Sequence, residues 1–342
     1  MDFHNPTVQF ILFSLVKIVG VFAILMPMIA YSTLAERLIS AWIQDRVGPN
    51  RVGPMGIWQP IVDGVKSFLK EDFTPAHVRK FYFWLAPAIT MIPAMLTIAV
   101  IPFGSTLGGQ QMVIADLNVG ILYTFGIVSL GVYGIVLAGY AANSKYPFLG
   151  GIRSSAQMIS YEIAMGMSVV PLFLIVGNLN LSKVIEYQAQ HGWLIWYAPV
   201  SFFIFLVSAF AETNRLPFDL PECETELVAG YNTEFGSMKF ALFFMGEYAN
   251  MIAGSAMMVV LFFGGWTLPW MTTPANTVLA GLLHIGIFIA KLLFFMVVFI
   301  WVRWMIPRFR YDQLMELGWR RAVPFALANI VFYALILWIR AK

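Results

Sequence analysis

The stretch AETNRLPFDLPECETELVAGYNTEFGSMK occupies residues 211–239 and lies between two long apolar runs. It carries six carboxylates but only two cations, Arg215 and Lys239. Charged loops between membrane spans are common, so a solvated loop is one interpretation. The other interpretation is that the acidic groups have a function, and this interpretation needs support from the rest of the sequence. The carboxylates are Glu212, Asp219, Glu222, Glu224, Glu226 and Glu234.

The composition indicates a membrane protein. The 342 residues are 60% hydrophobic and 11% charged, whereas soluble domains carry about 25% charged residues. The net charge of +3 is spread over loops, so no nucleic acid partner is implied. Cys223 is the only cysteine, which excludes an internal disulfide and an iron–sulfur cluster held by this chain alone. Only His284 among the four histidines lies in an apolar run, so neither a bis-histidine haem nor another metal site is expected.

Eight apolar segments approach the 20 or so residues that a helical span needs. Because open sheet edges are not tolerated in lipid, we expect an all-α polytopic bundle. The first run is too long for a cleavable signal peptide and lacks a small-residue cleavage pattern. We treat residues 1–342 as a single membrane domain with two functional loops, 34–80 and 211–239. The predicted spans are about 10–33, 81–103, 118–142, 157–177, 193–211, 238–265, 278–305 and 322–340.

The distribution of positive charge predicts the orientation of these spans. Most of the 21 Lys and Arg residues follow the first, third, fifth and seventh spans. Loops rich in Lys and Arg stay in the cytoplasm. Both termini are therefore expected on the non-cytoplasmic side, and the stretch 211–239 on the cytoplasmic side.

The long loop 34–80 is also patterned. Its first residues, 34–46, are expected to continue the helix of the first span. The pairs Gly48-Pro49 and Gly53-Pro54 then force irregular backbone. After Pro60, apolar residues recur at helical spacing on one face and polar residues on the other, which predicts an amphipathic helix. Such a helix either lies along the membrane interface or packs on the bundle, and the spacing does not separate these alternatives.

Charged residues inside spans are costly, so each is a functional candidate. Glu162 and Glu247 lie within the fourth and sixth predicted spans, and glutamate is too short to reach the interface easily. They are expected to face the bundle interior, where they either exchange protons or make a structural hydrogen bond. Lys17 is expected to reach toward the interface. Lys291 is expected either to pair with a buried carboxylate or to store a proton.

These acidic residues form a series from the cytoplasm into the membrane. Glu36 ends the first span and Glu212 the fifth, while Glu222, Glu224 and Glu226 follow at a spacing of two. The series predicts a proton path. Because the chain has no redox centre and no nucleotide motif, it is expected to be a subunit coupled to chemistry elsewhere.

Three motifs resemble a known family. They are ERLISAWIQDRVGPNRVGPMG (36–56), AETNRLPFDLPECETELVAGYNTEFGSMKFALFFMGEY (211–248) and FIWVRWMIPRFRYDQLMELGWR (299–320). The chain resembles, over its whole length, subunit 1 of proton-pumping NADH:quinone oxidoreductase, respiratory complex I. The resemblance implies a multi-pass protein of the bacterial inner membrane, or the mitochondrial equivalent, that forms much of a quinone tunnel and couples quinone reduction to proton translocation.

The resemblance also implies roles, cofactors and partners. Quinone is the expected substrate, and NADH, FMN and iron–sulfur clusters belong to partner subunits. The expected partners are peripheral-arm subunits of the quinone site, small membrane-arm subunits and membrane lipids. Arg215 and Asp219 are expected to shape the loop facing the quinone cavity, while Glu226 and Glu234 are expected to be solvated or structural. The expected acidic chain is Glu36, Asp63, Glu162, Glu212, Glu222, Glu224 and Glu247, and the expected tunnel wall and mouth are Arg37, Arg46, Trp58 and Phe68.

Two alternatives remain open at this point. One is the homologous membrane component of a hydrogenase or formate-linked complex, which handles no quinone; the motif at 36–56 favours the quinone enzyme. The other is a stand-alone transporter, against which the lack of readable inverted repeats argues.

Overall fold

The computed structural model describes residues 6–107, 110–220, 224–269 and 277–340. Within these ranges the chain is mainly helical and contains only two short strands, which confirms the predicted all-α membrane fold. Among the described residues, seven helical segments are long and apolar enough to cross a membrane, and α8 is a shorter apolar helix. The described elements are α1 (Pro6–Ile43), η1 (Pro54–Gly56), α2 (Gln59–Leu69), α3 (Lys80–Thr97), η2 (Ile98–Val100), β1 (Thr106–Leu107), β2 (Gln110–Gln111), α4 (Gly120–Ala141), α5 (Lys145–Val176), α6 (Leu181–His191), α7 (Leu194–Tyr197), α8 (Pro199–Glu212), α9 (Glu224–Leu227), η3 (Gly230–Asn232), α10 (Ser237–Phe262), α11 (Val278–Met305), α12 (Tyr311–Glu316), the π-helical turn η4 (Leu317–Ala322) and α13 (Val323–Arg340).

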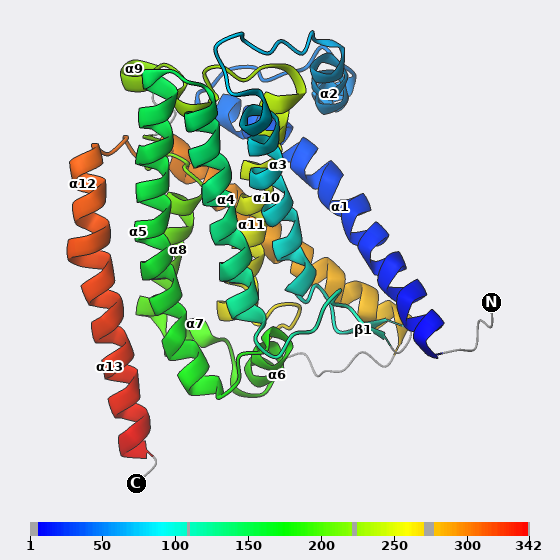
Figure 1. Ribbon diagram of the computed structural model, residues 1–342. Coiled ribbons are helices and arrows are strands. Elements are labelled where there is room, and N and C mark those ends of the chain that lie inside the picture. Colours follow the sequence, from blue (N-terminus) through cyan, green and yellow to red (C-terminus); the bar gives the residue numbers. More distant parts are fainter. Residues whose placement is uncertain (1–5, 108–109, 221–223, 270–276, 341–342) are drawn as a thin grey trace.

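Helix α10 forms the centre of the bundle. It packs against α3, α11, α1 and α8, and most of its side chains are buried. Helices α1 and α13 lie at opposite edges of the bundle (Figure 1). The strands β1 and β2 form a short antiparallel hairpin in which Thr106 pairs with Gln111. The functional stretch 211–239 thus leads from the end of α8 directly into the most buried helix.

Small residues let the helices approach closely, as is usual in membrane bundles. A Cβ atom on Gly139 of α4 would lie 2.6 Å from the carbonyl oxygen of Pro147 on α5. Similarly, a Cβ on Gly150 would lie 2.8 Å from the Cα of Gly230 in η3. Because these glycines lack side chains, α4 packs closely against α5, and the stretch that contains η3 packs against the first turns of α5.

The amphipathic helix predicted after Pro60 is α2. It lies beside the last turns of α1, outside the main bundle (Figure 1). Its apolar side chains Ile61, Val65 and Phe68 are all more than half exposed. Because the bundle does not cover this face, its position suits a helix that lies along the membrane interface.

Helix α8 is short because its segment is divided in two. Pro199 starts α8, and Ala198 before it leaves the helical region of backbone space with φ −136° and ψ 59°. Proline suits the first turn of a helix but disfavours a helical conformation in the residue before it. At about 1.5 Å per residue, 14 residues give a helix of roughly 21 Å.

Candidate functional site

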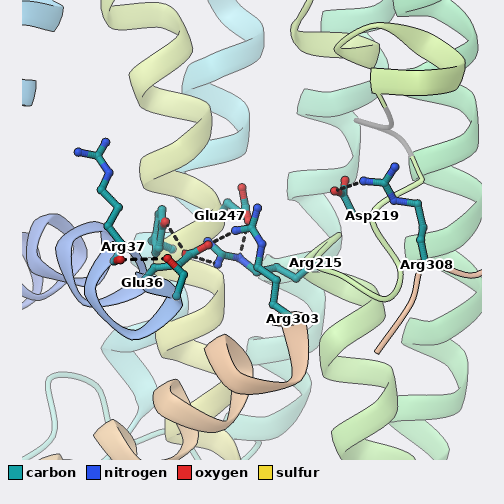
Figure 2. Close-up of polar contacts among 9 residues, drawn as sticks. Glu36, Arg37, Arg215, Asp219, Glu247, Arg303 and Arg308 are labelled. Carbon is teal, nitrogen blue, oxygen red and sulfur yellow. Dashed lines mark hydrogen bonds and ion pairs between the residues drawn. The ribbon is translucent and has the colours of Figure 1, made fainter. Parts of the chain in front are cut away.

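The centre of the site is Arg215, which lies in the loop after α8 and is almost fully buried. Its Nη1 donates to Oε2 of Glu36 on α1 over 2.5 Å. Its Nε donates to Oε1 of Glu247 on α10 over 2.6 Å. The guanidinium therefore joins two helices through carboxylates that the sequence alone does not bring together (Figure 2).

Glu36 has partners on both of its oxygens. The hydroxyl of Tyr248 on α10 donates to Oε2 over 2.7 Å, and Arg303 on α11 pairs with Oε1. The Arg215 guanidinium also lies 4.4 Å from the centre of the Tyr248 ring, in cation–π contact. We call Glu36, Arg215, Glu247, Tyr248 and Arg303 the charge cluster. It links α1, α10, α11 and the loop after α8.

The charges of this cluster balance. Two carboxylates face two guanidinium groups, so the members of the cluster neutralise one another. Burial alone lowers the pKa of Arg215, but Glu247 and Glu36 outweigh that effect and raise this pKa well above its usual value. Arg215 therefore remains a fixed cation, and any change of protonation in the cluster must fall on another member.

A second ion pair lies further along the same loop. Arg308, between α11 and α12, donates through Nη2 to Oδ2 of Asp219 over 3.1 Å (Figure 2). Burial raises the pKa of the Asp219 carboxyl to about 6, against the opposing effect of Arg308. Its other oxygen, Oδ1, is buried and has no hydrogen-bond partner in the described part of the chain. Asp219 can therefore change its charge near neutral pH.

A fully buried glutamine holds this loop in place. Nε2 of Gln157, on α5, donates to the carbonyl oxygens of Ala211 and Phe218 over 2.7 and 2.9 Å. The same atom is 3.1 Å from Oδ1 of Asn214. Buried backbone acceptors need such partners. One side chain of α5 thus positions the backbone on both sides of Arg215.

Glu212 and Glu162 form a separate acidic pair. Glu212 ends α8 and lines a small cavity of about 30 Å³, together with Thr97, Thr124 and Asn250. That volume has room for a water molecule. Glu162 on α5 is close enough for its charge to act on Glu212. Neither carboxylate makes an ion pair with any described residue, unlike Glu36. These two members of the predicted acidic chain therefore make no ion pair with any cation of the described residues.

The expected mouth residues lie on α2, on α1 and in the loop between these helices. Nη1 of Arg37 pairs with Oδ2 of Asp63 over 2.7 Å, which ties α1 to α2. Trp58 and Phe68 are exposed on and beside α2. Arg46 is exposed after α1, and its side chain donates to the neighbouring Gln44. Arg37 directly follows Glu36 along α1 but makes its ion pair with α2, so α1 connects the expected mouth to the charge cluster (Figure 2).

The remaining acidic residues of the loop differ in what they contact. Glu222, like Cys223, lies outside the described residues, and Glu224 is described only as the first residue of α9. Glu226 is exposed and pairs with Arg153 over 2.6 Å. Glu234 lies 3.7 Å from His77. Glu226 and Glu234 thus make peripheral contacts.

The two intramembrane lysines do not pair with carboxylates of the described residues. Nζ of Lys291 donates to the carbonyl oxygens of Phe263, Gly265 and Thr267, at 2.7, 3.0 and 2.6 Å. Lys291 therefore donates to backbone carbonyl groups where α10 ends. Pairing with a buried carboxylate, which was one alternative from the sequence, does not occur among the described residues. Lys17 donates to the carbonyl oxygen of Val113 over 3.2 Å.

Four side chains of the site were not predicted from the sequence: Gln157, Tyr248, Arg303 and Arg308. Arg303 lies at the end of an apolar run, where a basic residue is also expected as a topology signal. Tyr248 directly follows a predicted site residue. Only the run of basic residues in the motif 299–320 could have pointed to Arg303 and Arg308 as partners for the acidic stretch.

The fold and the charge cluster define a multi-pass membrane protein with buried ionisable groups at one end of its bundle. Known proteins specify it further. Residues 16–334 match the family described as NADH dehydrogenase. The chain is 48% identical over 331 residues to an H-type subunit of the NADH-quinone oxidoreductase of Cytophaga hutchinsonii, covering 95% of this chain and 96% of that protein. It is also 48% identical over 341 residues to the corresponding protein of Geobacter metallireducens, covering 98% and 100%.

A third relative, the H-type subunit of the NADH-quinone oxidoreductase of Flavobacterium johnsoniae, is 48% identical over 329 residues, which cover 94% of each chain. The protein therefore belongs to the NADH dehydrogenase family and is a membrane subunit of an NADH-quinone oxidoreductase complex.

Proposed function

We propose that this chain forms much of the quinone tunnel of its complex and couples quinone reduction to proton translocation through buried carboxylates. The observation that carries the proposal is the charge cluster, in which Arg215 joins Glu36 of α1 to Glu247 of α10. Such a cluster is costly to bury unless every charge is paired. A change of charge beside it therefore has a large effect on its members.

The proposed coupling is electrostatic. Reduction of a quinone near the loop after α8 adds negative charge that protons must neutralise. Two unit charges about 6 Å apart interact by about 3 kcal/mol at an effective dielectric constant near 20, which equals roughly two pKa units. This energy is enough to move a proton between neighbouring carboxylates. Because Arg215 stays charged, the proton moves between carboxylates.

The proposed proton path leads from the loop into the bundle. Asp219 is a candidate for its entrance, because its carboxyl titrates near neutral pH. Glu212 and Glu162 follow, and the cavity that Glu212 lines has room for a water molecule. The other members that we propose are Glu36, Asp63, Glu222, Glu224 and Glu247.

The proposed tunnel mouth is the region around α2. The exposed apolar face of α2 can lie against the bilayer, and the Arg37–Asp63 pair fixes it to α1. Trp58, Phe68 and Arg46 complete the proposed mouth. A long apolar quinone tail entering here would approach the charge cluster along α1.

We infer the assembly and orientation from the same features. NADH, FMN and iron–sulfur clusters belong to partner subunits, and peripheral-arm subunits meet this chain at the end that carries α2, α9 and the loop after α8. Small membrane-arm subunits contact its sides. That end faces the cytoplasm and both termini face the opposite side, as the Lys and Arg distribution predicts.

The test is to replace Glu212 or Glu247 with Gln in the assembled enzyme. Quinone reductase activity and protons moved per NADH are then measured in closed vesicles. We expect either variant to reduce both quantities. The matched control is Glu186→Gln on α6, whose exposed carboxylate pairs with Lys183 at the opposite end of the bundle. Unchanged rates and unchanged proton yield in both site variants would refute the proposed roles.

A further inference from the structure

A second cavity extends along α1, from Lys17 on the side of the bundle opposite the charge cluster to Ile252, which lies about one turn of α10 from Tyr248. It has a volume of about 390 Å³ and lies between the first half of α1, η2 with the segment after it, α10 and α11. Its wall includes Val16, Ile24, Ile252 and Phe288, and all but two of its described lining residues are apolar or glycine. The two polar lining residues are Lys17 and Gln110.

Lys17 marks the depth of this cavity in the bilayer. It precedes Glu36 of the charge cluster by 19 residues on α1, or about 28 Å along the helix. A hydrocarbon core is about 30 Å thick. Lys17 therefore lies near the membrane boundary opposite the charge cluster, and its Nζ contacts the carbonyl oxygen of Val113 in the loop after β2.

The positive charge at this boundary has no counter-charge within the described ranges. There, Lys17 makes no ion pair with any carboxylate. The α1 face next to the cavity is exposed, with Val16 and Val19 both more than half accessible. An apolar groove that opens to lipid, with one cation at its outer end, has the shape and charge of a site for an anionic amphiphile.

We propose that this groove binds one acyl chain of an anionic phospholipid from the leaflet opposite the charge cluster. Lys17 pairs with the lipid phosphate, and the chain runs between α1 and α11 toward Ile252. A quinone is a poorer occupant, because its carbonyl oxygens can accept a hydrogen bond from Lys17 but its uncharged head group supplies no counter-charge. The lipid fills the space that α1 leaves beside the bundle and so supports the position of this edge helix.

Two substitutions separate the head group from the chain. Lys17→Gln removes the cation and is expected to weaken binding about fivefold, the equivalent of about 1 kcal/mol for one basic residue near an anionic surface. Gly20→Leu fills the groove, since Gly20 lines it and a Cβ atom there meets nothing within 4 Å. Gly286→Leu on α11 is the matched control, because it also has open space but does not line the groove.

The experiment uses the intact complex in vesicles that contain phosphatidylglycerol with a photoreactive acyl chain. After illumination, mass spectrometry maps the labelled peptides of this chain. We expect labelling of residues 13–28, about fivefold less in Lys17→Gln, almost none in Gly20→Leu and unchanged labelling in Gly286→Leu. NADH oxidation by an artificial acceptor checks that each variant assembles.

Four outcomes would overturn the proposal. The first is equal labelling by photoreactive phosphatidylcholine, which would exclude recognition of the anionic head group. The second is displacement of the label by added quinone, which would identify a quinone-tail site. The third is cross-linking of a photoreactive residue at Ile24 to another membrane subunit, which would identify a protein occupant. The fourth is labelling that neither Lys17→Gln nor Gly20→Leu reduces.

Discussion

Replacing Arg215 with Met tests whether the charge cluster depends on charge balance. The substitution keeps an apolar stem of similar length but removes the cation that lies between Glu36 and Glu247. Glu36 keeps Arg303 and Tyr248 as partners. Glu247 loses its ion pair and is left as an uncompensated charge.

The structure sets the size of the expected effect. Breaking a buried ion pair on one side costs about 3–5 kcal/mol. The Glu247 side chain is 21% exposed, so water screens part of its charge and the lower end applies. We expect Arg215→Met to reduce the free energy of unfolding by about 3 kcal/mol, or more than a hundredfold in the unfolding equilibrium.

A second substitution distinguishes charge from packing. Adding Glu247→Gln to Arg215→Met removes the uncompensated carboxylate while Glu36 and Arg303 remain paired. The double variant should therefore be more stable than Arg215→Met alone. The assay is the half-life of the purified complex at elevated temperature, followed by loss of its quinone reductase activity. A double variant that is less stable than Arg215→Met would contradict the proposed balance of charges.

Three further perturbations test the loop and its support. Burial raises the pKa of the Asp219 carboxyl to about 6. Between about pH 4 and 6 the folded chain therefore binds more protons at Asp219 than the unfolded chain does. The free energy of unfolding should fall as pH rises through this window and level off above it. Asp219→Asn should flatten this part of the thermal stability profile, although it also weakens the contact with Arg308. Gln157→Leu leaves buried backbone carbonyls without their donor and should cost about 1–3 kcal/mol, measured as faster thermal inactivation and faster proteolysis of residues 211–220. Gly150→Ala places a Cβ 2.8 Å from backbone and should cost about 1–3 kcal/mol, whereas Gly166→Ala on the same helix has open space and should leave the thermal inactivation rate unchanged or lower.

Local patterns in the sequence were sufficient to predict most of the long helices, although the predicted span 193–211 is divided into α7 and α8. An apolar run of about 20 residues favours transfer from water into the bilayer, and this free energy depends only on the composition of that segment. The amphipathic spacing after Pro60 likewise predicted α2, because this spacing depends only on neighbours along the chain. The acidic stretch could likewise be singled out, since an excess of carboxylates between spans is visible in the sequence. Motifs also carried the family, which the relatives confirm.

Pairing inside the bundle could not be predicted in this way. The carboxylate of Glu36 meets Arg215 across 179 positions and Arg303 across 267. No local pattern determines which cation neutralises which carboxylate at such separations. The role of Lys291 shows the same limit: a carboxylate partner was one expectation, but the fold brings the lysine to three backbone carbonyls where α10 ends.

The sequence by itself therefore determined that this is a helical membrane protein, where most of its long apolar helices and its acidic stretch lie, and which family it belongs to. These properties follow from the composition of contiguous segments and from long motifs. Only the tertiary structure decided that Arg215 is the centre of the charge cluster and that Glu212 and Glu162 pair with no cation of the described residues. The physical reason is that desolvation and Coulomb interactions depend on distances in space, which helix packing sets.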